Sequence, residues 1–381
     1  SVAGAGVRGA VDTAYSRRAA AASLSAIEVG LDELRKLDRA SATGLPPTMV
    51  GTEPSFGYRV TDPADGDLGN NPEDPAKIVG VGQAGRARWA ETAIAVDDPG
   101  RPIEPMASAL HARDRLTIDS GAVLTAIGAP VSVDTELELL GTIDSNARAG
   151  SSFGPGTVTG TLITGAEQRG IARRAVFDEW AARATDLGFS GDMTGHVLAP
   201  GVNSYSVSGT NKHGIYYINT GGADIEIRRS RVHGTLLIDA REDGTVTIRH
   251  EMLMEPARPD APVLMIRGEV ELELRDDSLE ENSRSLNPPG APYQGAEDLD
   301  TSDSYPSEIR GLVYVFGHLT IERDGIYRGS ILVDGGATVR DQPVIHHDRM
   351  LVLSPPLGFG DNQTVGDMRL LPLSHERIPL P

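Results

Sequence analysis

The sequence predicts a mainly β fold class: an N-terminal long α-helix, a small antiparallel sheet, and then a β-solenoid (β-helix) with an interrupting helix. Three observations predict this class. Apolar residues recur at steps of three and four in the first forty residues, and later segments alternate apolar with polar residues. Glycines also open short aliphatic runs at spacings of 18 to 20 residues.

The composition agrees with many turns that join short strands, because 44 of the 381 residues are Gly, 25 are Pro and only 4% are aromatic. A formal net charge of −19 disfavours binding to nucleic acid or to anionic lipid. The chain contains no Cys, which excludes disulfides, thiolate metal sites and cysteine nucleophiles. It also lacks a run of about 18 apolar residues, so we expect no membrane-spanning segment in this sequence.

Residues 1–48 are predicted to hold the N-terminal helix, which runs from about Val2 to Ala40 and stops before Gly44. Its apolar stripe consists of Leu24, Ile27, Leu31 and Leu34. This stripe could pack on the chain's own domain, or it could dock against other helices if the helix continues from an upstream segment. We favour the second interpretation, so these four residues form the predicted assembly face.

Residues 49–118 are predicted to form the small β-subdomain. Apolar and polar residues alternate around Tyr58, Ile78 and Ile94, and an acidic, Pro- and Gly-rich loop covers residues 61–75. This period of two, bounded by turn residues, is typical of strands in an antiparallel sheet.

Residues 119–357 are predicted to form the β-solenoid, whose coils of about 20 residues bury apolar side chains only against neighbouring coils. We expect Ile215, Leu236, Val313 and Ile331 to line its interior. A β-sandwich is the competing interpretation, because strands in a sandwich alternate in the same way.

Three segments depart from the regular coils. A helix near 167–188 interrupts them, with Val176, Trp180, Ala184 and Leu187 on one stripe and Gly188 as its stop. Trp180 is expected to anchor a core. Residues 282–307 form an excursion between coils, and residues 358–381 form a Pro-rich C-terminal tail.

Two glycine motifs match known patterns but lack the surrounding elements that those patterns need. Gly80-Val-Gly-Gln-Ala-Gly85 matches a dinucleotide-binding loop, yet no alternation of strands and helices follows, so we interpret it as a glycine hairpin. Ser152 in Gly150-Ser-Ser-Phe-Gly154 matches a nucleophile elbow, yet Pro155 and Gly156 disfavour the helix that must follow. We therefore predict no catalytic and no cofactor-binding residue in either motif.

One pair of carboxylates has a spacing that would suit catalysis. Asp224 and Glu226 lie two residues apart on a predicted strand and share its outward face, about 7 Å apart. That separation suits an inverting glycosidase. The neighbouring Arg228 and Arg229 favour surface ion pairs instead.

Two acidic loops are weak calcium candidates, because carboxylate oxygens are the ligands that this cation prefers. One loop holds Asp62, Asp65, Asp67 and Asp74, and the other holds Asp298, Asp300 and Asp303. Solvated turns remain the simpler interpretation of both loops. His346, His347 and Asp348 are poor metal ligands, because adjacent residues of a strand point to opposite faces.

These segments resemble large bacterial surface proteins of the type IV minor pilin/pseudopilin-like class that carry a C-terminal β-solenoid. Ala19–Leu34 is similar to the membrane-distal part of the pilin helix, and Tyr58–Leu68 resembles the first sheet after it. The other similar segments are Val176–Trp180, Gly214–Ile218, Tyr305–Tyr314 and Ser354–Phe359. The family's processing site and the hydrophobic half of its helix are not found after Ser1, so we expect membrane contact only through a segment upstream of Ser1.

The resemblance implies a non-enzymatic structural subunit that is extracytoplasmic, either secreted or on the cell surface. Its helix would dock with other pilin-like subunits, as a homo- or hetero-oligomer, in a filament or in a secretion or pilus complex, with the solenoid displayed outward. Two alternatives stay open: a carbohydrate-active β-solenoid enzyme, and a scaffold whose solenoid ends stack on one another. We expect no nucleic-acid partner and no cofactor, with calcium as the one candidate ion.

Overall fold

The computed structural model divides the chain into two compact units, residues 1–98 with 362–381 and residues 99–361. It describes residues 2–36, 54–63, 66–68, 74–98, 100–282, 284–288, 290–295, 300–361, 368–372 and 374–379. The expected fold class is confirmed, since a long helix and a small antiparallel sheet make up the first unit and a large, mainly parallel sheet makes up the second. The expected β-solenoid, and not the competing sandwich, accounts for that parallel pairing.

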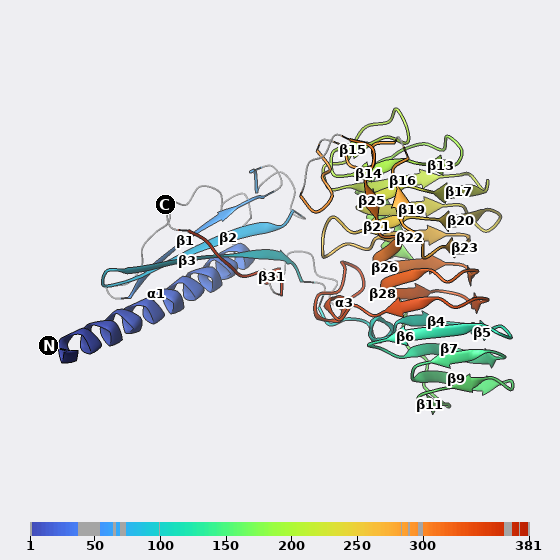
Figure 1. Ribbon diagram of the computed structural model, residues 1–381, viewed down its shortest axis with the longest axis horizontal. Coiled ribbons are helices and arrows are strands. Elements are labelled where there is room, and N and C mark those ends of the chain that lie inside the picture. The colour runs from blue at the N-terminus through green and yellow to red at the C-terminus, as the bar shows by residue number, and fades with distance from the viewer. Residues whose placement is uncertain are drawn as a thin grey trace. The chain divides into compact units, whose positions relative to one another are not determined.

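The first unit is one helix packed on one antiparallel sheet, as the traces of α1, β1, β2 and β3 show (Figure 1). Its elements are α1 (Val2–Lys36), β1 (Ser55–Thr61), β2 (Ala76–Ala84), β3 (Ala87–Asp97), β31 (Met368–Leu370) and β32 (Glu376–Arg377). The last two strands pair with β3, so part of the expected C-terminal tail completes the sheet. The predicted end of the helix between Ala40 and Gly44 lies outside the described residues.

Small residues bring α1 unusually close to β2. A Cβ atom added to Gly82 would lie 2.0 Å from the carbonyl oxygen of Ala19, and one added to Gly80 would lie 2.3 Å from that of Ser23. The Ser23 hydroxyl donates to the Gly80 carbonyl at 3.0 Å. Gly85 lies in the turn between β2 and β3 with φ of +56°, which confirms the predicted hairpin. Gly80 and Gly82 allow α1 to pack closely on β2, which the motif alone does not predict.

The second unit consists of coils whose parallel strands form three faces, stacked as Figure 1 shows. The first face contains β4 (Leu110–Ala112), β11 (Leu162–Ile163), β12 (Thr185–Asp186), β16 (Ile215–Asn219), β19 (Thr235–Asp239) and β22 (Leu264–Arg267). The second contains β5 (Arg115–Ile118), β13 (Met193–Thr194), β17 (Ile225–Arg228), β20 (Thr245–His250), β23 (Glu269–Leu274), β27 (Leu319–Ile321) and β29 (Ala337–Val339). The third contains β6 (Val123–Ile127), β8 (Thr142–Asp144), β10 (Thr157–Val158), β14 (Val197–Ala199), β18 (Arg231–His233), β21 (Leu253–Glu255) and β30 (Val344–His346).

The remaining elements of the second unit connect or cover these faces. Four longer strands run through two faces each: β7 (Val131–Leu139), β9 (Ala147–Phe153), β26 (Glu308–Phe316) and β28 (Ile326–Val333). The other elements are η2 (Glu104–Ala107), α2 (Ala175–Ala181), β15 (Val202–Asn203), β24 (Leu279–Glu280), β25 (Ser304–Tyr305) and α3 (Met350–Leu353). Strands β4 and β5 belong to the solenoid, so it begins near residue 110 and not at the expected residue 119.

A continuous row of buried residues fills the interior of the first face. Register partners along it are Tyr216, Leu236, Leu264, Val313, Ile331, Leu110, Val131 and Ala147. Three of the four predicted interior residues lie in this row. Ile215 does not, because the interior position is the second residue after the coil's glycine, which makes it Tyr216. The Tyr216 hydroxyl donates to the carbonyl groups of Ala199 and Val202, each at 2.8 Å, which satisfies its buried oxygen.

The coils do not stack in chain order. The first coil, which contains β4, pairs on one side with β7 of the next coil and on the other side with β28 of the last coils. In Figure 1 the orange β28 therefore lies beside the teal β4. From the first coil the chain builds outward to β10 and β11, then passes through α2 to the opposite end and builds back from β12 to β30. Parallel strands accept any neighbour with a matching aliphatic row, so spacing alone could not predict this order.

Helix α2 and the excursion both cover parts of the outside of the coils. Helix α2 packs Val176, Phe177 and Trp180 on the first face, and Trp180 is buried with its indole N–H donating to the Leu357 carbonyl at 3.1 Å. Trp180 is thus the predicted core anchor, although α2 ends well before Gly188 and Leu187 belongs to the solenoid interior. The excursion lies on the third face, where the buried guanidinium of Arg231 donates to the carbonyl groups of Leu286 and Ala291.

We predict that Gly82→Ala destabilises the first unit by about 1–3 kcal/mol, because the new methyl group overlaps backbone atoms of α1 that cannot move without shifting the helix. Urea unfolding followed by circular dichroism at 222 nm checks this, since α1 holds most of the described helical residues. Gly170→Ala is the control, because its Cβ would have no heavy atom within 4 Å. Equal unfolding midpoints for both variants and the unchanged chain would contradict the close contact.

Candidate functional site

The predicted assembly face is mostly an internal face. Ile27, Leu31 and Leu34 are buried in a cluster with residues of the sheet, including Ile78. Only Leu24 points outward, with 43% of its surface exposed. The stripe therefore serves the helix–sheet packing that was the alternative interpretation, and three of its four residues cannot contact another subunit while the first unit is folded.

The exposed part of α1 has a different location. Among the described side chains of α1, Tyr15 is the first that reaches the sheet, where its ring lies 3.2 Å from the position of a Cβ on Gly85. Upstream, the described side chains of Asp12, Thr13 and Ala14 are exposed. The N-terminal turns of α1 extend past the hairpin of β2 and β3 (Figure 1). Residues 2–14 of the helix span about 20 Å. No helix among the described residues is long and apolar enough to cross a membrane.

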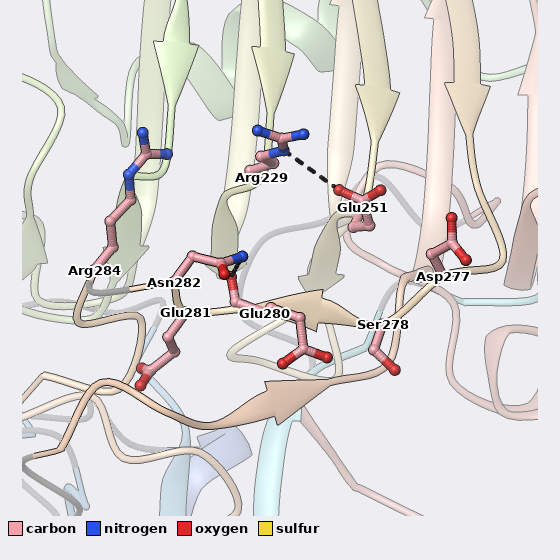
Figure 2. A pocket seen from close by; sticks show the side chains of 8 residues that line it. All are labelled: Arg229, Glu251, Asp277, Ser278, Glu280, Glu281, Asn282 and Arg284. Carbon is pink, nitrogen blue, oxygen red and sulfur yellow. Dashed lines mark hydrogen bonds and ion pairs between the residues drawn. The ribbon is translucent and has the colours of Figure 1, made fainter.

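A hollow of about 530 Å³ in the second unit lies beside the third face. Its lining residues are Arg229, Glu251, Asp277, Ser278, Glu280, Glu281, Asn282 and Arg284, all drawn in Figure 2. Arg229 and Glu251 form an ion pair there at 3.5 Å. All eight side chains are polar, whereas ligand pockets are mostly apolar with a few polar groups. The hollow therefore fits a hydrated surface better than an enclosed active site.

Glu281 is the one buried acid of this hollow, and its role is structural. One carboxylate oxygen accepts hydrogen bonds from the Leu286 N–H at 2.8 Å and the Tyr305 hydroxyl at 3.0 Å. The other accepts from the Asp303 N–H at 3.2 Å. Burial and this neighbouring carboxylate raise the pKa of Tyr305. These bonds hold the two ends of the excursion together.

A second hollow of about 420 Å³ lies at a corner beside α2. It contains three arginines, but two of them are already engaged. Arg267 stacks on the Phe177 ring at 4.2 Å and pairs with Asp178 at 2.8 Å. Arg174 pairs with Asp334 at 3.2 Å. These cations therefore fix α2 to the first face.

On the second face, Glu226 is held in surface ion pairs, as the favoured interpretation expected, whereas Asp224 accepts a backbone hydrogen bond. Glu226 accepts from Arg228 at 2.8 Å and from Arg249 at 3.0 Å. Asp224 accepts from the Thr245 N–H at 2.8 Å. Arg249 also approaches Glu273 of the next coil at 3.6 Å, so the charges form a ladder along the face.

The calcium candidates do not converge in the described part of the chain. Asp65 and Asp298 lie outside the described residues. Asp62 is buried, whereas Asp67 is exposed. Asp300 accepts hydrogen bonds from the N–H and hydroxyl of Ser302, and Asp303 accepts one from the Tyr305 hydroxyl. Among the described residues no three acidic or histidine side chains are grouped as a metal site.

The other sequence motifs also take structural positions. His347 contacts the Met106 carbonyl at 2.9 Å, and Asp348 accepts from the Met350 N–H at the start of α3. Ser152 lies on β9 as the register partner of the buried Leu137, and a glycine corner follows that strand instead of the helix of a nucleophile elbow.

Sequence reasoning missed a buried polar cluster on the outside of the first face. His111 Nδ1 lies 2.9 Å from the Ser132 hydroxyl and 3.1 Å from a guanidinium nitrogen of Arg169, while Nε2 lies 3.6 Å from Asp134. Burial, and then the charge of Arg169, lowers the pKa of His111 to about 3. Burial is also the main cause that raises the pKa of Asp134.

This cluster resembles a catalytic triad only in composition. His111 and Ser132 are buried, so substrate cannot reach them in this conformation. Arg169 comes from the segment that joins β11 to α2, and its contacts with the cluster hold that segment on the coils. His111 lies 21 positions from Ser132 and 58 from Arg169 in the chain, and the coil register brings them together.

Comparison with known proteins adds distant likenesses only. No family model matches the chain. No curated protein matches it in sequence. The competence-associated pilin ComZ from Thermus thermophilus is similar in structure with a TM-score of 0.36 and 11% identity, over 96% of this chain and 98% of that chain.

Two ice-binding proteins are also similar in structure. One, from an Antarctic biological consortium, has a TM-score of 0.33 and 15% identity, over 64% of this chain and 90% of that chain. The other, from the Antarctic ascomycete Antarctomyces psychrotrophicus, has a TM-score of 0.28 and 8% identity, over 65% of this chain and all of that chain.

We predict that acid destabilises the second unit partly through His111. The folded state holds this imidazole neutral down to a pH of about 3, whereas the unfolded chain protonates it near 6.5. The contribution of His111 to the free energy of unfolding is fully present above pH 6.5. It falls by about 1.4 kcal/mol per pH unit between pH 6.5 and pH 3. The raised pKa of Asp134 acts in the opposite sense.

Urea unfolding at several pH values, for the unchanged chain and His111→Gln, measures this contribution. The glutamine variant should lose less stability between pH 7 and pH 4. Parallel pH profiles for the two proteins would contradict the assignment to His111.

Proposed function

We propose that the protein is a non-enzymatic, exported structural subunit that docks into a larger assembly through α1 and displays its solenoid outward. The observation that carries this proposal is the exposure of α1. Among the side chains that the structure describes, Asp12, Thr13 and Ala14 are exposed, Tyr15 contacts the sheet, and the outward side of the helix is exposed as far as Leu24 and beyond. Other pilin-like subunits are the partners of the proposed interface.

The N-terminal turns of α1 would gain most from such docking. Residues 2–14 include three glycines, each of which weakens an isolated helix by about 1 kcal/mol relative to alanine. A single helix of this length is marginal in water, so packing on neighbouring helices would stabilise it. The docking surface proposed here is thus the exposed side of α1 from Asp12 to Leu24, in place of the buried stripe.

The second face of the solenoid supports display and does not favour catalysis. Its charged ladder keeps the surface hydrated, and Asp224 and Glu226 are both held by neighbours. The carbohydrate-active alternative therefore gains no support from this pair. We place the subunit outside the cytoplasm, on the cell surface or secreted, as part of the same proposal.

We predict that Leu24→Glu removes the protein from its assembly without unfolding it. The side chain is exposed, so the fold tolerates a charge, but a charge between docked helices would be desolvated at high cost. Surface filaments sheared from producing cells and immunoblotted for this chain give the measurement, with an expected loss of at least tenfold.

Val207→Glu is the matched control, because it also replaces an exposed aliphatic side chain but lies on the solenoid. It should remain in the sheared fraction. Equal recovery of Leu24→Glu and the unchanged chain, or absence of the unchanged chain from that fraction, would contradict the proposed docking.

A further inference from the structure

The two ends of the solenoid are built differently, and one end is closed. Residues 200–211 pass over the coil that contains β12 and β13, which lies at one end of the stack. Tyr205 inserts into the interior cluster and its hydroxyl donates to the Gly191 carbonyl at 2.6 Å. The Ser208 hydroxyl donates to the Leu187 carbonyl at 2.9 Å, beside the edge of β12. Strand β15 folds back antiparallel on β14. A neighbouring coil therefore has no place to stack at this end.

The opposite end is open. Strand β10 pairs only with β8, and β11 pairs only with β9, so their outer edges face no described strand. The last interior side chain of the first face, Leu162, is 38% exposed because no further coil covers it. Ile163 beside it is 56% exposed, and Phe153 is also exposed at this end. Open parallel edges of this kind readily accept another strand.

This end also lacks charge. The 18 residues from Ala149 to Ala166 contain no Asp, Glu, Lys or Arg, although 23% of the chain is charged. Two copies of a chain with net charge −19 repel each other over most surfaces. Residues 149–166 add no charge to that repulsion at the open end, and apolar side chains with unpaired backbone groups can be buried there.

We propose that the open end, residues 149–166, is a homodimer interface in which two solenoids meet end to end. A second copy is the occupant because its own open end offers the same charge-free surface and the same unpaired strand edges. The closed end excludes head-to-tail stacking, so the contact joins two like ends about a two-fold axis. That axis makes β11 of one copy antiparallel to β11 of the second copy, which is a favourable strand pairing.

The proposal does not depend on docking through α1. Burying the end of the core and pairing the strand edges would join two stems into one continuous stack of coils. The pairing also covers an exposed strand edge that would otherwise promote disordered aggregation.

Analytical ultracentrifugation of the full chain tests the proposal. We expect a monomer–dimer equilibrium for the unchanged chain, and at least a tenfold weaker dimer for Ile163→Glu, because the two-fold axis would bring the new charges together. Val207→Glu, at the closed end, should dimerise normally, and so should Leu24→Glu in α1. A monomer at all concentrations, a dimer insensitive to Ile163→Glu, or a dimer lost in Leu24→Glu would overturn the proposal.

A disulfide experiment tests the symmetry independently. The chain has no Cys, so a single Ile163→Cys substitution reports only on contacts between like ends. We expect mild oxidation to link this variant into a covalent dimer and to leave Val207→Cys monomeric. If the two variants cross-link only when mixed, the ends stack head to tail and the two-fold arrangement is wrong.

Discussion

Register between neighbouring coils is the constraint on which the second unit depends. Each coil contributes one apolar residue per face to a shared interior row, and a parallel ladder of hydrogen bonds holds the rows aligned. No coil can bury its apolar face alone, so stability comes from neighbours. The same register fixes the outside of each face. On the outer surface of the first face, one row of register partners begins with apolar residues that α2 covers, including Leu237, Tyr314 and Leu332. The same row continues with the polar His111 and Ser132, which Arg169 covers.

The stacking of coils out of chain order produces both the open end of the solenoid and the segment that crosses its first face. Because the first coil lies between the last coils and β7, the chain must end one side of the stack at β10 and β11 and cross along the first face to begin the other. The crossing segment carries α2 and Arg169, and the turn-around leaves an open coil. In the first unit a different rule applies, since glycines on β2 and small residues on α1 allow close packing and leave the other side of the helix exposed. The exposed side of α1 and the open end of the solenoid therefore both follow from the way in which the core of each unit is packed.

The sequence predicted what depends on local patterns. Alternation located the strands of both units, glycine spacing indicated the coils, and Trp180 was correctly expected to anchor a core. Near Gly214 the alternation predicts the wrong interior residue by one position, because Ile215 and Tyr216 are both apolar and the pattern alone does not show which of them points inward. The prediction that Ile27, Leu31 and Leu34 contact other subunits is wrong, because periodicity shows that a helix face is buried but not which element buries it. The coil order, the His111 cluster and the excursion held by Arg231 depend on contacts between distant residues, which no local pattern encodes.

Cross-linking between the first and the last coils tests the central claim most directly. Thr117 on β5 and Thr338 on β29 are register partners on the outer surface of the second face, although 221 positions separate them. Cysteines at both positions should form a disulfide on mild oxidation, because adjacent strands lie about 5 Å apart. The pair Thr117→Cys with Thr320→Cys should not, because Thr320 is one coil further away. A missing disulfide in the first pair, or equal formation in both, would contradict the stacking order from which the open end and the crossing segment follow.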